Sequence, residues 1–194
     1  MAICWKTCIV VPPLAGRTIE VSGVTRPDYD IIGTVKKRPG QIISRKDRLA
    51  YYLAGFVDGE GSFNVSLRKK PDYAIKWQVV LSFNVSQKDI TVLEILRKTL
   101  NCEIIKTRKS DGLHLYEVTS IQDINQKIIP YFSHIGFISN TKIVNFKIFA
   151  EIANLVNEGK HRKMDTLREI LVLREKLNLG KGRKRKYSIK DIFQ

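Results

Sequence analysis

The segment YLAGFVDGEGSF, residues 52–63, places two acids among glycines at the point where a helical pattern gives way to a strand pattern. Before it, apolar side chains recur at the spacing of one helix face: Leu49, Tyr52, Leu53 and Phe56. Ser44 and Asp47 form an S-x-x-D cap that predicts the helix start, and the glycines at 59 and 61 predict its end. The sequence therefore predicts a helix with Glu60 just beyond its end.

Two runs that alternate apolar and polar residues follow this helix. They predict two antiparallel strands, joined by a turn at 71–73. A helix at about 88–100 and a second hairpin around a turn at 110–112 come next, and the remaining helices are expected at about 121–132, 140–157 and 162–177. This order predicts an α+β fold, in which a four-stranded antiparallel, saddle-like sheet has its helices on one face.

The chain divides by composition into three parts. Residues 1–44 hold four of the six prolines and are expected to form an N-terminal extension. Residues 45–178 are expected to form the folded domain, and residues 179–194 a basic C-terminal tail. The tail has five basic residues among positions 181–186, so it could contact phosphates that flank a bound nucleic acid, or it could be a solvated segment.

The net charge of the chain indicates which class of partner it binds. Thirty-four Lys and Arg against nineteen Asp and Glu give a formal net charge of +15, which favours nucleic acid over an anionic membrane surface. Three cysteines form no disulfide framework and indicate a reducing compartment. No apolar run reaches the roughly 18 residues of a membrane span, so no membrane partner is expected.

One face of the predicted sheet carries side chains suited to reading base edges. Arg and Lys pair with guanine, and Asn and Gln pair with adenine, in a major groove wide enough for a β-ribbon. A solvated sheet face is the alternative interpretation. The expected DNA-binding residues are Asn64, Ser66, Arg68, Lys70, Gln78, Val80, Ser82, Asn84, Lys106, Arg108 and Glu117.

A carboxylate is unexpected on such a basic, DNA-binding surface, because it repels phosphate. A divalent cation between Glu60 and the DNA backbone would remove that repulsion, and carboxylate oxygen is the ligand that Mg²⁺ prefers. The glycine at 59 lets the backbone approach closely, so that the Gly59 carbonyl could assist. The alternative is that Asp58 and Glu60 lie in an ordinary polar turn.

The string LAGFVDGEGSF closely resembles the signature of the LAGLIDADG homing endonucleases, and the resemblance covers about residues 44–157. It implies site-specific hydrolysis of both strands of a DNA duplex with Mg²⁺ or Mn²⁺, leaving short 3′ overhangs, with Glu60 and Gly59 as metal ligands. Because the chain carries one motif, the resemblance implies a homodimer and a long, nearly palindromic target. The implied dimer interface is Leu53, Ala54, Gly55, Val57 and Asp58.

The resemblance also implies two further catalytic positions. Gln87 matches a polar residue near the attacking water, and Lys142 is the nearest candidate for a lysine that stabilises the transition state. The sequence departs from the family at Thr91, where a basic residue is common, and at Asn140, which aligns with the usual lysine.

Two alternative functions fit the same scaffold. One is an RNA maturase for a host intron, and the other is a non-catalytic DNA-binding regulator. The presence of Glu60 favours DNA cleavage over both. The resemblance places such a protein in an organelle, chloroplast or mitochondrion, or in a prokaryotic cytoplasm.

Overall fold

A computed structural model of the protein describes residues 43–102, 104–179 and 185–193. The chain divides into two units, Met1–Asp30 and Ile31–Gln194, and all described residues belong to the second. The expected N-terminal extension, apart from its last two residues, lies outside the described residues, as do positions 180–184 of the basic tail.

Helices and strands follow the predicted order. They are α1 (Arg45–Glu60), β1 (Gly61–Lys69), β2 (Trp77–Gln87), α2 (Ile90–Leu100), β3 (Ile105–Thr107), β4 (His114–Val118), α3 (Ile121–Asp123), the π-helix η1 (Ile124–Ile128), α4 (Ile129–Ile135), α5 (Asn140–Asn157), the 3₁₀ turn η2 (Lys160–Arg162) and α6 (Met164–Lys176). No helix among the described residues is long and apolar enough to cross a membrane.

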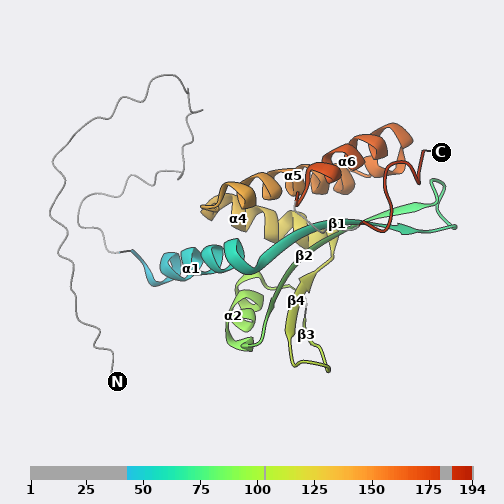
Figure 1. Ribbon diagram of the computed structural model, residues 1–194. Coiled ribbons are helices and arrows are strands. Elements are labelled where there is room, and N and C mark those ends of the chain that lie inside the picture. The colour runs from blue at the N-terminus through green and yellow to red at the C-terminus, as the bar shows by residue number, and fades with distance from the viewer. Residues whose placement is uncertain (1–42, 103, 180–184, 194) are drawn as a thin grey trace, which may run out of the picture. The chain divides into compact units, whose positions relative to one another are not determined.

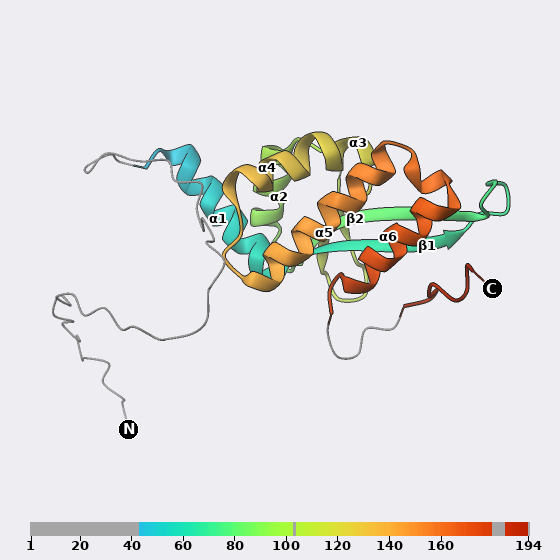
Figure 2. The ribbon, with the colours of Figure 1, turned by 90° about the horizontal axis from the view of Figure 1, so that it is seen from above.

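The four strands form one antiparallel sheet in the order β1-β2-β4-β3, which confirms the predicted α+β fold. Helices α5 and α6 lie over β1 and β2 on one side of the sheet (Figures 1 and 2). The inward side chains of the strands share one apolar core with the buried side chains of the helices. Among the described residues, the helices pack on this apolar face, and the polar side chains of β1 and β2 point to the opposite one.

A cluster of aromatic rings packs beside the motif. Phe63, the third residue of β1, is 1% exposed, and its ring lies 5.1–5.3 Å from the rings of Phe83, Phe146 and Phe149. Aromatic pairs at this separation each add about 0.5–1.5 kcal/mol beyond the burial of their area. This cluster anchors the start of β1, and with it the end of α1.

The helix predicted at 121–132 contains a π turn. Pro130 has no N–H group, and its ring would clash with the carbonyl four residues earlier in a regular helix. The wider turn at η1 removes that conflict, because the Ile129 N–H donates to Ile124 five residues back. Pro130, within an otherwise apolar helical pattern, is the sequence feature from which an irregular turn could have been predicted.

Candidate active site

The motif acid Glu60 is the last residue of α1. The Ser44 hydroxyl accepts a 3.0 Å bond from the Asp47 N–H at the helix start, as predicted. At the other end, α1 continues through Gly59 and includes Glu60, which the sequence had placed just beyond the helix end. The helix tolerates Gly59, and the Gly61 N–H closes it by donating to Val57. The Glu60 side chain is exposed, at the junction with β1.

The other motif acid, Asp58, joins the end of α1 to the start of α5. Its carboxylate accepts hydrogen bonds from the Ile138 N–H at 3.2 Å, from the Ser139 N–H at 2.9 Å and from the Ser139 hydroxyl. Ser139 is in turn the N-cap of α5, since its hydroxyl accepts from the Lys142 N–H. Asp58 therefore positions the helix that carries Lys142. Sequence reasoning missed Ser139, although a serine before a helix is a recognisable cap.

Lys142 lies beside the end of α1. Its Nζ donates to the Gly61 carbonyl, and the side chain is partly buried. Burial lowers the pKa of Lys142, and the negative charges of Asp58 and Glu60 oppose that shift by favouring the ammonium form. The third candidate, Gln87, ends β2 two residues after Val85, which pairs with Gly61. It therefore lies at the same end of the sheet as Glu60.

The end of α1 is electrostatically suited to a cation. The C-terminal end of a helix carries a partial negative charge, and the last carbonyls of a helix lack intrahelical donors. In α1, which is described throughout, the last turn contains no basic side chain, and Glu60 adds a further negative charge. The exposed carboxylate and the neighbouring Gly59 carbonyl are hard oxygen donors that fit a divalent ion such as Mg²⁺.

Gly61 is required by close packing at this junction. A Cβ built there would lie 2.6 Å from Val57 Cγ1 and 2.7 Å from the Val57 carbonyl oxygen. Since the carbonyl is backbone, we expect Gly61→Ala to lower the free energy of unfolding by about 1–3 kcal/mol. Urea unfolding measures this, with Gly59→Ala as the control because, apart from the helix backbone and the adjacent residues, no described atom lies within 4 Å of a Cβ built there. An equal loss of stability in both variants would contradict the steric argument.

The sheet brings most of the predicted DNA-binding residues onto one face. The register pairs Asn64 with Ser82, Ser66 with Val80, Arg68 with Gln78, and Asn84 with Glu117. Their neighbours in each strand are the buried core residues, so these side chains and Lys106 point to the face opposite the helices.

Two members of the set lie outside the strands. Lys70 and Arg108 lie just beyond the ends of β1 and β3, because the strands are shorter than predicted. Arg108 forms a 3.0 Å ion pair with Asp111 in the turn. Lys106 forms a 3.2 Å ion pair with Glu117, which accounts for an acid on this face.

The predicted interface residues lie on two sides of α1. Leu53 and Val57 are 0% exposed, so their side chains belong to the core of this chain and offer no surface to a partner. The opposite side of the same helix is exposed and is here called the outer stripe of α1; it includes Tyr51, Tyr52 and Gly55. Of the other predicted contacts, Ala54 is 5% exposed, and the Asp58 carboxylate is bonded within the chain.

Comparison with known proteins identifies the family. The LAGLIDADG endonuclease profile matches residues 53–153, which include the motif, the sheet and most of α5. The chain belongs to the LAGLIDADG endonuclease family. Among its relatives, DNA endonuclease I-CvuI of Chlorella vulgaris is 30% identical, and the match covers 64% of this chain and 91% of I-CvuI.

Solved structures of the family have the same fold. The meganuclease I-SmaMI bound to uncleaveable DNA superposes with a TM-score of 0.63 at 32% identity, covering 69% of this chain and 46% of that one. The homing endonuclease I-TnaI gives a TM-score of 0.63 at 28% identity, covering 68% of this chain and 88% of I-TnaI. The Neurospora crassa protein named probable intron-encoded endonuclease 2 is 33% identical over 145 residues, and this chain covers 32% of its length. The chain thus spans a third to a half of some of its relatives.

Proposed function

We propose that this protein is a site-specific DNA endonuclease of the homing type, which hydrolyses one phosphodiester bond in each strand of a long, nearly palindromic duplex. The observation that carries the proposal is the position of Glu60. Its exposed carboxylate lies at the end of α1, beside Lys142 and at one end of the polar sheet face. Membership of the LAGLIDADG endonuclease family supports the same reaction class.

DNA would lie along the free face of the sheet. The nine residues of β1 and the eleven of β2 offer Arg, Gln, Asn and Ser side chains at alternate positions. Each good bidentate pair with a base is worth about 1–3 kcal/mol of discrimination, so a long site gains specificity from many modest contacts. The net charge of +15 would add phosphate contacts that do not depend on sequence.

Each catalytic side chain has a separate role in this proposal. Glu60 and the Gly59 carbonyl would hold a divalent ion, Mg²⁺ or Mn²⁺, which supplies an activated water and charge stabilisation when bound. The remaining ligands would come from DNA and from a second motif helix. Gln87 would orient the attacking water, and the Lys142 ammonium would stabilise the charge that develops on the phosphate. I-SmaMI has been crystallised with uncleaved DNA and calcium ions.

The second motif helix would come from a second copy of this chain. The outer stripe of α1 exposes 47% of Tyr51 and 53% of Tyr52, and Gly55 leaves space for a close approach. A hollow of about 180 Å³ lies between this stripe and residues 135–138, where Ile138 is 84% exposed. A two-fold axis along α1 would cover this apolar surface and bring the two Glu60 side chains together.

Selection from a randomised duplex library tests the function. The wild-type protein with Mg²⁺ is expected to enrich one long, two-fold-related site and to cut both strands within it. We expect the active protein in a reducing, DNA-containing compartment, such as an organelle or a prokaryotic cytoplasm. Enrichment of structured RNA in place of duplex DNA would overturn the proposal.

Lys142 gives a test of transition-state stabilisation. Lys142→Met is expected to lower the single-turnover cleavage rate by about 10²-fold, because one charge-stabilising donor is lost, while the Kd for DNA stays nearly unchanged. Lys147→Met removes the same charge from the exposed side of α5 and is the control. If both variants slow cleavage equally, net charge is responsible and Lys142 has no specific role.

A further inference from the structure

The DNA-facing strand β1 lies at an edge of the sheet, and side chains from the end of the chain bind its free carbonyls. The Asn178 side-chain amide donates to the Phe63 carbonyl at 2.7 Å, and Arg174 Nε donates to the Val65 carbonyl at 3.1 Å. Arg174 is 3% exposed, and it reaches β1 from α6. Two central residues of β1 are thus held from the side opposite β2.

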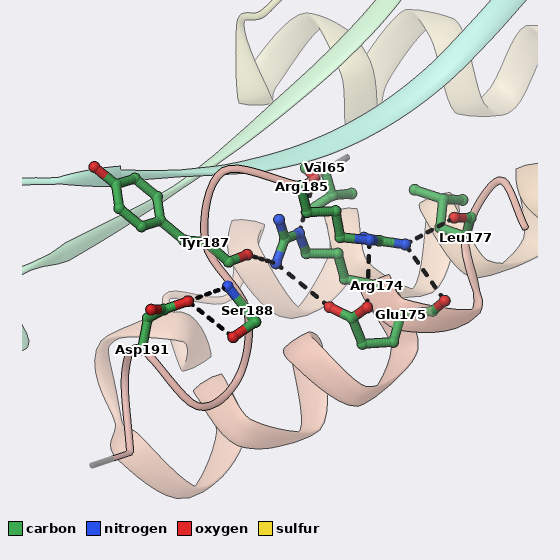
Figure 3. A network of polar contacts seen from close by, with 8 residues as sticks. All are labelled: Val65, Arg174, Glu175, Leu177, Arg185, Tyr187, Ser188 and Asp191. Carbon is green, nitrogen blue, oxygen red and sulfur yellow. Dashed lines mark hydrogen bonds and ion pairs between the residues drawn. The ribbon is translucent and has the colours of Figure 1, made fainter. Parts of the chain in front are cut away.

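Residues 185–193, here called the C-terminal segment, continue this support. Figure 3 shows Arg174 between β1 and the segment, where its Nη1 donates to the Tyr187 carbonyl at 3.0 Å. Arg185 holds the segment on α6: its Nη2 donates to the carbonyls of Glu175 and Leu177, and its Nε lies 3.3 Å from the Glu175 carboxylate. Part of the expected basic tail therefore packs on the folded domain.

The C-terminal segment also covers the back of the β1–β2 hairpin. The Tyr187 ring packs edge-on against Trp77 with centroids 4.9 Å apart, and Lys69 Nζ lies within 5.6 Å of both rings. Trp77 pairs with Lys69 in the register, directly next to the pair of Arg68 and Gln78. Because successive side chains point to opposite faces, Tyr187 lies behind the base-reading pair.

We propose that the C-terminal segment is a positioning element for DNA specificity. It fixes the outer end of the β1–β2 hairpin through Arg174, Arg185 and Tyr187, and so sets which base Arg68 and Gln78 read without touching DNA itself. The inference rests on the proposed function, since it concerns the selectivity of the same sheet face. It assigns a role to a buried arginine that the catalytic chemistry does not use.

The test compares two variants of the segment with a charge-matched control. Arg185→Ala removes the bonds to α6, and Tyr187→Ala removes the ring but keeps the backbone carbonyl that Arg174 binds. Lys190→Ala removes one positive charge from an exposed position of the same segment. Base preferences are measured by selection from a randomised duplex library, and Arg68→Ala identifies the base positions that this pair reads.

We expect Arg185→Ala and Tyr187→Ala to reduce discrimination at those positions about tenfold, the scale of one lost bidentate contact. The maximal cleavage rate on the best site should stay within twofold, and Lys190→Ala should leave the base preferences unchanged. Hydrogen exchange of the β1 and β2 amides near Arg68 and Gln78 should be faster in both test variants.

Two results would overturn the inference while leaving the proposed function intact. One is unchanged base preference and unchanged exchange in both test variants. The other is a uniform loss of affinity for all sequences in Arg185→Ala and Lys190→Ala alike, with a lower salt dependence, which identifies phosphate contacts. If the wild-type protein enriches no duplex site, the proposed function fails and the inference fails with it.

Discussion

Glu60→Gln is expected to abolish cleavage of the cognate duplex while leaving its binding intact. Glutamine keeps the size of the side chain but removes the negative charge that holds a hard cation. A bound metal ion stabilises the charged transition state by several kcal/mol, so its loss lowers the cleavage rate by about 10³-fold or more. Since the Glu60 side chain is exposed at the end of α1, the substitution should not change the free energy of unfolding.

Single-turnover cleavage with Mg²⁺ and a binding assay with Ca²⁺ separate the two effects. Glu94→Gln removes an equal charge from an exposed position on α2, and it should cut like the wild type. Because Glu60→Gln removes an anion from a DNA-binding surface, its affinity in the absence of divalent ions should rise slightly. Cleavage at the wild-type rate by Glu60→Gln would show that this carboxylate is not the metal ligand.

The sequence predicted the fold because its local patterns are consistent with one another. The cap at Ser44, the helical spacing through Phe56 and the strict alternation from Phe63 to Val85 each specify one element, and their order leaves few ways to build a shared core. The polar face followed from the same alternation. That is why the predicted contact residues within the strands lie on one face.

Contacts between segments that lie far apart in the sequence could not be predicted from one sequence. The bond of Asp58 to Ser139 joins positions 81 residues apart, and the bond of Arg174 to Val65 joins positions 109 apart. The interface residues show the same limit. The family resemblance implied Leu53 and Val57 as interface residues, but one sequence could not show that both side chains are buried in the core of their own chain.

Gly55→Gln is expected to dissociate the proposed dimer and to stop double-strand cleavage. Gly55 is exposed, and apart from the backbone of α1 itself and the adjacent residues, no described atom lies within 4 Å of a Cβ built there. Glutamine also has a better helix propensity than glycine, so the single chain should become more stable by up to about 1 kcal/mol. At a two-fold interface the added side chain appears twice, and overpacking of about 1–3 kcal/mol at each copy raises the dimer Kd by about 10³-fold.

Sedimentation equilibrium measures this change, and supercoiled plasmid reports the catalytic consequence. A chain that has lost its partner presents one Glu60 to the DNA, so linear product should disappear. The control is Lys46→Gln, at an exposed position in the first turn of α1. Lys46 lies seven residues before Leu53, and so on the side of the helix away from the outer stripe. This variant should therefore remain a dimer. If Gly55→Gln remains a dimer that cuts both strands, the two copies do not meet through the outer stripe of α1, and a different surface must bring their acids together.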